Sequence, residues 1–227
     1  MNEIPLELKD YIKNYLIFRP ENKEILQIAV DLWCNDKKEA IKIYGDISNW
    51  NTILITDMSN LFAEKNEFDD DISRWNVSNV KFMKGMFYSA HSFDQEIERW
   101  DVSNVKDMSY MFYDTELFNK SLNNWDVSKV LNMEKMFALT NIFNQPLDRW
   151  DVSNVRNMSE MFFGAVSFNQ SINNWKILKL VNMDRMFFGT ISYNQSLTNW
   201  EISKVKLMNS VFDNAESFQK ENAQWIN

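Results

Sequence analysis

The sequence predicts a repeat solenoid of the α/β class, with one short parallel strand and one short helix in each 25-residue coil and an α-helical cap at the N-terminus. Tryptophan recurs every 25 residues from Trp50 to Trp225, and the residues in between share a pattern. Such a period is typical of stacked units, none of which buries its apolar face alone. Residues 1–48 lack the period. We therefore assign residues 1–48 to a helical N-terminal cap and residues 49–227 to a solenoid of seven 25-residue repeats.

Three apolar positions recur in every repeat, and they predict the core. Counted from the tryptophan as position 0, position 8 is methionine, position 12 is phenylalanine and position 18 is aromatic. The residues are Met58, Met83, Met108, Met133, Met158, Met183 and Met208, then Phe62, Phe87, Phe112, Phe137, Phe162, Phe187 and Phe212, then Phe68, Phe93, Phe118, Phe143, Phe168, Tyr193 and Phe218. Positions that keep one bulky apolar type while their neighbours vary indicate inward-facing stacks. The methionines are therefore expected in the core and not as ligands of a soft metal.

The middle of each repeat predicts a short helix. In the repeat that begins at Trp150, apolar residues follow a helical or 3₁₀ spacing at Val155, Met158, Met161, Phe162 and Ala165. Ser153 or Asn154 stands where a helix N-cap is needed.

The residues around each tryptophan predict a short strand. Leu122, Trp125 and Val127 follow the spacing L-x-x-L-x-L, which is typical of the short parallel strand of a leucine-rich repeat. Each repeat is therefore expected to contain a strand, a cap, a short helix and a return loop.

The string WDVSNVxxMSxMFxxAxxFNQ, present from Trp150 and repeated with small changes elsewhere, resembles the 25-residue repeat of BspA-like leucine-rich repeat proteins. That group is typical of bacterial and mycoplasma surfaces. The resemblance covers residues 50–225 and implies a leucine-rich-repeat-like solenoid used for adhesion or protein binding. Leu61 and Val211, in the outermost repeats, replace the second methionine of the pattern.

The N-terminal residues read as three amphipathic helices. The first has an apolar face from Leu8 to Leu16 after Pro5, and the second has one from Ile25 to Trp33. A third is predicted by Asp36 three residues before Glu39, a capping-box pair, and ends at Gly45. Their expected role is to cover the open edge of the first coil, at Trp50. Residues 4–16 also faintly resemble the opening helix of an F-box, which would make the chain an adaptor; a plain cap shows the same pattern.

Composition narrows the class of function. The net charge is −8, from 24 basic and 32 acidic residues, with no basic stripe, so nucleic acid is not an expected partner. The single cysteine, Cys34, excludes an internal disulfide framework. The sequence shows no signal peptide and no apolar run long enough to insert in a membrane. These observations favour an intracellular or virion-associated location over a secreted one.

The sequence offers no set of residues for catalysis, a cofactor or a metal. His91 is the only histidine, and no nucleophile motif accompanies it. Cys34 is expected on the buried side of a helix. The acidic run at residues 69–71 lacks the spacing of a calcium loop, and a solvated loop is the favoured interpretation. We therefore expect a protein that is not an enzyme.

The polar columns beside the tryptophans form the candidate partner-binding face. The residues just before and just after each tryptophan are expected to point outward from the strand. They are Arg74, Arg99, Asp101, Asn124, Asp126, Arg149, Asp151, Asn174, Lys176 and Asn199. A face of mixed charge could also serve only solubility. We predict a non-catalytic protein–protein interaction module; a structural or adhesive component of a surface or virion is the alternative.

The C-terminal repeat departs from the pattern. Val211 replaces a methionine, and Asn222 stands at position 22, where the other repeats have isoleucine or leucine. This edge is expected to be either a frayed end or a docking site for another protein chain. The sequence identifies neither the partner nor the oligomeric state.

Overall fold

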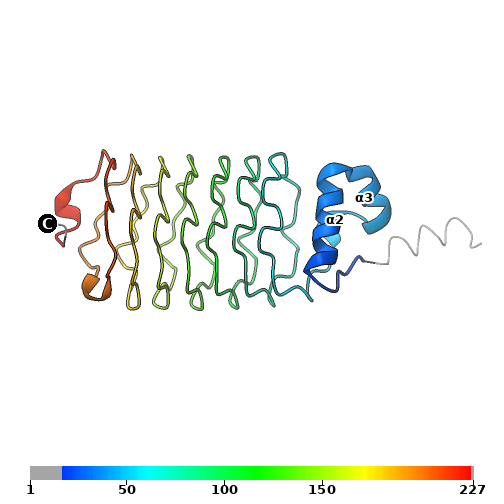
Figure 1. Cartoon of the computed structure of the whole chain (residues 1–227), viewed down its shortest axis with the longest axis horizontal. Helices are drawn as coiled ribbons and strands as arrows, with labels where there is room; N and C mark the ends of the chain where they lie inside the picture. Colours follow the sequence, from blue (N-terminus) through cyan, green and yellow to red (C-terminus); the bar gives the residue numbers. More distant parts are fainter. Residues whose placement is uncertain (1–16, 226–227) are drawn as a thin grey trace, which may run out of the picture.

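The computed structural model describes residues 17–225, in which two helices adjoin a stack of coils (Figure 1). The helices are α2, Lys23–Asn35, and α3, Lys37–Tyr44. Three short 3₁₀ helices are η1 at Ile47–Asn49, η2 at Ile202–Lys204 and η3 at Lys220–Asn222. The coils fill the length between η1 and η3, and α2 lies against one end of the stack.

Side-chain caps fix the ends of α2 and α3. The Asn22 side chain accepts a hydrogen bond from the Ile25 N–H at 2.9 Å, and Asp36 accepts one from the Glu39 N–H at 3.1 Å. Gly45 ends α3 with φ at +73°, a conformation that suits glycine. The two later helices thus form where the sequence predicts them. The predicted helix at residues 8–16, and with it the F-box resemblance, lies outside the described residues.

The recurring apolar positions form one continuous core. All methionines at position 8 from Met58 to Met183 are fully buried, and so are the phenylalanines at position 12 from Phe62 to Phe187. Successive rings at position 12 stack with centroids 5.3–5.8 Å apart. Those at position 18 stack at 5.9–6.1 Å. The inward assignment of these columns is confirmed, with Met208, 44% exposed, as the exception at position 8.

At each junction between neighbouring coils, four backbone hydrogen bonds run in the same direction. In each coil the N–H groups at positions 8, 10, 12 and 14 donate to the carbonyls at positions 7, 9, 11 and 13 of the next coil, at 2.7–3.0 Å. Met58, for example, donates to Phe82, and Asn60 donates to Lys84. All six junctions between the seven coils follow this rule. These four donors of a coil therefore face the C-terminal end of the stack, and their acceptors face the N-terminal end. Other bonds, such as that from the Lys81 N–H to the Thr56 carbonyl at 2.8 Å, run the opposite way.

The coil backbone of residues 50–225 forms no extended strand and no α-helix, so the predicted strand-plus-helix coil is wrong. Within residues 50–225 the bridges between coils are isolated parallel pairs, from Asp57 with Phe82 to Asn182 with Leu207, and no extended strand forms. The predicted helix from position 5 to position 15 is instead a series of turns. Positions 10 and 14 have positive φ in every coil, between 50° and 66°, and this breaks the helix twice.

The caps and strands expected from the sequence have other roles. The Ser153 N–H donates to Asp151 Oδ1 at 3.0 Å, which closes a turn in place of a helix N-cap. Leu122, Trp125 and Val127 are buried as expected, but they lie in irregular backbone that flanks turns. The fold is a stack of turn-built coils and not a strand–helix leucine-rich-repeat solenoid.

Side chains add hydrogen bonds between coils. Each tryptophan from Trp75 to Trp225 donates its indole N–H to a carbonyl one coil back, at 2.9–3.4 Å. At position 19, an Asp or Asn oxygen accepts from the backbone N–H of the same position in the next coil, as Asn144 does from Asn169 at 2.9 Å. These two ladders hold the coils in register.

Candidate functional site

The ten polar residues predicted to form a partner-binding face are all exposed. This is true of Arg74, Arg99, Asp101, Asn124, Asp126, Arg149, Asp151, Asn174, Lys176 and Asn199. The geometric part of the prediction, that they point outward beside the buried tryptophans, is therefore confirmed. Whether a partner contacts them stays a prediction.

Most of these side chains already have partners within the protein. Asp101 and Asp126 each accept from the backbone N–H two residues later, at 3.1 and 3.0 Å. The Arg149 guanidinium donates to Asn124 Oδ1 at 3.0 Å, and Asn174 donates to the Asp148 carbonyl at 2.6 Å. The aspartates thus close turns, and hydrogen bonds from Ser128 hold the Asp126 pKa below its usual value. Much of this face serves the coil itself.

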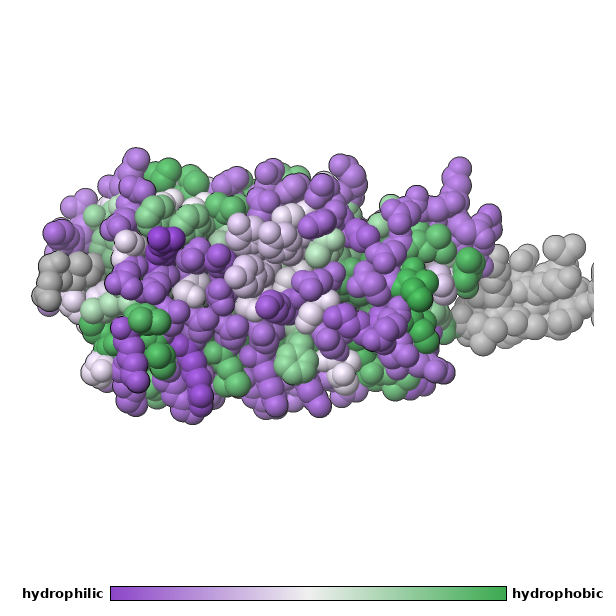
Figure 2. All heavy atoms as spheres, viewed as in Figure 1, coloured by the Kyte–Doolittle hydropathy of each residue, from purple (hydrophilic) through white to green (hydrophobic). Residues whose placement is uncertain are grey.

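A second surface feature, which we call the aromatic row, lies at position 13 of the coils. It consists of Tyr88 and Tyr113, whose ring centroids are 4.8 Å apart, and of Phe163 and Phe188, 5.0 Å apart. Both pairs are stacked nearly parallel, and all four side chains are half-buried. The surface of the stack is otherwise mainly hydrophilic with separate apolar spots, as Figure 2 shows for one face.

A third tyrosine and several cations lie next to the aromatic row. The ring of Tyr110 lies 5.9 Å from that of Tyr113, and Lys135 and Lys84 lie over it at 5.5 and 5.7 Å. The Tyr110 hydroxyl donates to Glu134 at 2.9 Å. Partial burial and this carboxylate raise the Tyr110 pKa to about 12, so the phenol stays protonated. Farther along, the Arg185 guanidinium lies 6.0 Å from the Phe188 ring.

Sequence reasoning missed the aromatic row because its column is interrupted. Position 13 reads Ala63, Tyr88, Tyr113, Ala138, Phe163, Phe188 and Asp213. A search for a residue type shared by all repeats passes over it. The usable signal is the pair of consecutive repeats with the same aromatic residue, which places two identical rings one coil apart.

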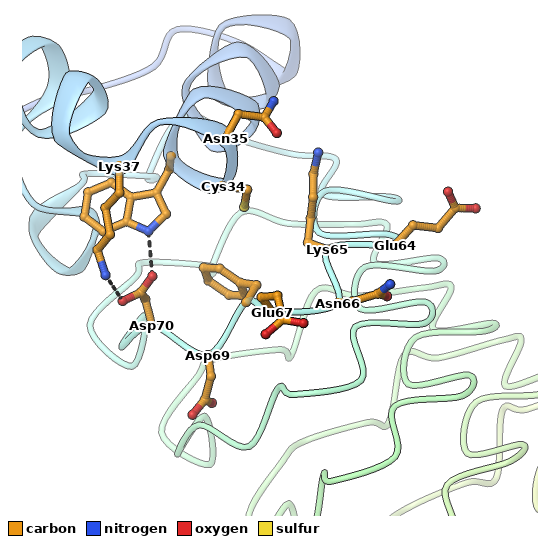
Figure 3. Close-up of a pocket in the computed structure, with 11 residues that line it drawn as sticks. Cys34, Asn35, Lys37, Glu64, Lys65, Asn66, Glu67, Asp69 and Asp70 are labelled. Carbon is orange, nitrogen blue, oxygen red and sulfur yellow. Dashed lines mark hydrogen bonds and ion pairs between the residues drawn. The ribbon is translucent and has the colours of Figure 1, made fainter.

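A hollow of about 640 Å³ lies where α2 and α3 meet the first coil (Figure 3). Asp70 of the first coil contacts both helices: the Trp33 indole N–H donates to Asp70 Oδ2 at 2.7 Å, and Lys37 pairs with Asp70 Oδ1. On the helix side, Lys65 pairs with Asp31 at 2.7 Å. These contacts attach the helices to the coil, and they use both cations that line the hollow, Lys37 and Lys65.

Cys34 lines the same hollow, but its chemistry does not suit a nucleophile. Burial raises the pKa of its thiol to about 11, although Lys65 opposes the shift. The reactive thiolate is therefore scarce at neutral pH.

His91 does not form a catalytic triad with its neighbours. His91 Nε2 and Ser89 Oγ each contact the same oxygen of Asp114, at 3.2 Å, so the histidine does not lie between the serine and the acid. Glu116 brings a third potential ligand atom, all three atoms lying within 4.8 Å of one another. The Asp114 oxygen already accepts from two groups, and Glu116 is exposed. The sequence does not reveal this cluster because both Asp114 and Glu116 belong to the repeat that follows the one of His91.

The family described as Mycoplasma protein of unknown function, DUF285, matches residues 34–148 and 116–225. These two overlapping matches cover well over half of the chain. The chain belongs to this family. No curated protein and no solved structure matches the chain.

This result corrects the family expected from the sequence. The resemblance to BspA-like leucine-rich repeat proteins was drawn from the repeat pattern, but the matching family is the Mycoplasma one. The turn-built coils agree with the correction, because the strand and helix that the resemblance implied do not form. The expectation of a repeated sequence is confirmed, because the family model matches the chain twice. Among residues 17–225, no helix has the length and apolar character needed to cross a membrane.

Proposed function

We propose that this protein is a non-catalytic protein-binding module and that the aromatic row is the centre of its binding surface. The observation that carries the proposal is the pair of stacked tyrosines, Tyr88 and Tyr113, on the side of the stack. Their rings are half-buried, so they are held by the protein and still have surface to offer. Tyrosine and arginine are enriched among residues that dominate binding energy at interfaces.

Preorganisation supports this role. Tyr110 is fixed by its hydrogen bond to Glu134, and Lys135 by its ion pair with Glu160 at 3.3 Å. A side chain that is already held in place loses little conformational entropy when a partner binds. The cations beside the rings favour a partner segment with carboxylates next to apolar side chains.

The polar columns beside the tryptophans have a secondary role in this proposal. Their aspartates close turns, and their mixed charges keep the coil surface soluble. An arginine such as Arg149 can still contact a partner that extends along the stack.

The repeats supply substitutions that test the proposal without disturbing the fold. Alanine occupies position 13 in two coils, as Ala63 and Ala138, so Tyr88→Ala with Tyr113→Ala is compatible with the coil. Asparagine precedes the tryptophan of four coils, so Arg149→Asn is a matched control on the polar face. Proteins retained from the native cell by each immobilised variant would be compared by quantitative mass spectrometry, after thermal unfolding has shown that each variant is folded.

We expect a protein retained by the wild type to be retained by Arg149→Asn and lost from the double tyrosine variant. Its purified form should then bind the wild type at least 10-fold more tightly than the double variant, because hot-spot aromatics cost about 2 kcal/mol or more on truncation. Loss from Arg149→Asn with retention by the double tyrosine variant would instead assign binding to the polar columns.

A further inference from the structure

The last coil presents a row of backbone donors with no acceptor in the described chain. At the six internal junctions the N–H groups at positions 8, 10, 12 and 14 bond to the next coil. In the seventh coil the same groups belong to Met208, Ser210, Phe212 and Asn214, and none of them has an acceptor within residues 17–225. We call this set the donor row. Ser210 and Asn214 keep the positive φ of the internal coils, so the row has the same conformation as a row that binds a coil.

Apolar surface accompanies the donor row. Met208 is 44% exposed, whereas its counterparts in the other coils are fully buried. Phe212, Phe218 and Trp225 pack on the core with one side only partly covered. Together with Val211 they line a hollow of about 490 Å³ at this end of the stack. The row and the hollow thus form one surface that combines unpaired donors with apolar side chains.

The opposite end of the stack is covered. There the first coil presents its carbonyl row, and α2 lies against it. Gln27 donates to the Leu61 carbonyl at 3.1 Å, and Lys23 pairs with Asp57 at 3.2 Å. The helix therefore supplies side-chain donors to an edge that offers acceptors, and the two ends differ in both chemistry and coverage.

The polarity of the donor row limits what can dock on it. A second copy docked tail to tail would place N–H groups against N–H groups, and these repel. A second copy docked head to tail would have to displace α2 from its own carbonyl row. An ordinary β-strand presents both N–H and C=O groups along one side, so only half of its groups would find partners.

The geometry points to one kind of occupant: a further coil of this repeat pattern, supplied by a second polypeptide whose first coil is not capped by a helix. We infer that the donor row binds the carbonyls at positions 7, 9, 11 and 13 of that coil, as every internal donor row does. The partner's tryptophan and phenylalanine would continue the stacks that end at Phe212 and Trp225. This inference concerns the end of the stack and is independent of the function proposed for the aromatic row.

A synthetic peptide tests the inference directly. The probe is a fluorescent peptide with the sequence of residues 150–175, which is one repeat with the flanking tryptophan, and its control has the same composition in shuffled order. Fluorescence anisotropy would measure binding to the full chain. Met208→Pro removes the first donor of the row, which makes no bond in the described chain, and Met208→Ala removes the side chain but keeps the donor.

We expect the repeat peptide to bind and the shuffled peptide not to bind. Relative to Met208→Ala, the proline variant should bind about 3- to 10-fold more weakly, the value of one hydrogen bond. Hydrogen exchange at Met208, Ser210, Phe212 and Asn214 should slow when the peptide is added. Equal binding of both peptides, or equal binding by the two Met208 variants without slower exchange in the row, would overturn the inference. The double tyrosine variant should bind the peptide like the wild type, so this result is separable from the proposed function.

Discussion

The indole Nε1 of Trp150 donates to the carbonyl oxygen of Leu122, 2.9 Å away in the preceding coil. Both residues are buried, and the same bond recurs along the stack, ending with Trp225 and Leu197 at 3.4 Å. A buried carbonyl that loses its donor costs free energy, because no water replaces the bond. Because the last of these bonds is longer and only partly buried, its contribution to stability is expected to be smaller than that of an internal one.

Trp150→Phe is expected to lower the free energy of unfolding by about 2 to 4 kcal/mol, from the lost hydrogen bond and the smaller ring. Trp225→Phe, at the partly buried end of the ladder, should cost about 1 kcal/mol or less. Urea unfolding followed by circular dichroism would measure both. Equal losses would show that the terminal tryptophan is as well packed as the internal one.

Positive φ at non-glycine residues offers a route to a more stable protein. Glu64 is exposed and has φ at +61°, a region that costs an L-residue about 1 kcal/mol. Glu64→Gly should raise the free energy of unfolding by about 0.5 to 1 kcal/mol, with its backbone bond to Tyr88 retained. The matched control is Glu24→Gly in α2, where the same change should cost about 1 kcal/mol. Destabilisation by both changes would contradict the strain at Glu64.

The positive φ angles at positions 10 and 14 explain why the core could be predicted from the sequence and the backbone conformation could not. The core columns were predictable because packing selects one residue type: Met158 and Phe162 have buried counterparts in nearly every coil. The helix from Val155 was wrong because the breaks fall at Glu160 and Gly164, and only the glycine carries a signal for positive φ. Elsewhere the same two positions hold residues such as Tyr110 and Leu139, which give no warning.

The surface shows the same division. Exposure of Arg149 and Asp151 followed from their places beside a buried tryptophan. That Asp151 closes a turn could not be read from a pattern assigned to a strand. The aromatic row was missed because Ala138 interrupts it, and the donor row depends on a backbone conformation that side chains do not reveal.

Cys34 is expected to react slowly with iodoacetamide. With its pKa raised to about 11 by burial, its thiolate fraction at pH 8 should be roughly 200-fold below that of a free cysteine with a pKa of about 8.5. The rate in the native protein should rise steeply between pH 8 and pH 10, and mass spectrometry would follow the modification. The urea-unfolded chain is the control, and it should react quickly at pH 8. Fast reaction of the native protein at pH 8 would contradict the raised pKa.

Stability is expected to fall in acid through carboxylates that close turns. Hydrogen bonds from Ser128 lower the pKa of Asp126, and those from Ser73 lower the pKa of Asp71. A depressed folded-state pKa means that the contribution is fully present above the unfolded value near 4 and is lost as the pH falls through the folded value. The contribution of these carboxylates to the melting temperature should therefore stay constant from pH 7 to about pH 5. The melting temperature should then drop below about pH 4.

Asp126→Asn is the matched variant for this pH dependence. Asparagine accepts the same bond without titrating, as Asn76 does from Ser78 at 3.1 Å. The variant should resemble the wild type at pH 7, within about 0.5 kcal/mol, and should lose less stability below pH 4. An acid transition identical to that of the wild type would show that the Asp126 carboxylate does not contribute.

The phenylalanine column compares the middle of the stack with its end. Within this column the Phe137 ring stacks between Phe112 and Phe162, at 5.6 and 5.8 Å, whereas Phe212 has one neighbour in the column, Phe187, at 5.3 Å. Phe137→Ala should lower the free energy of unfolding by about 3 to 5 kcal/mol, as large-to-small changes in a closed core do. Phe212→Ala should cost about 1 to 2 kcal/mol, because its ring is partly exposed and the surroundings can relax. Urea midpoints would compare the two variants at low protein concentration. Equal midpoints would mean that the last coil is covered in solution, since only a second layer of contacts would make Phe212 as costly to remove as Phe137.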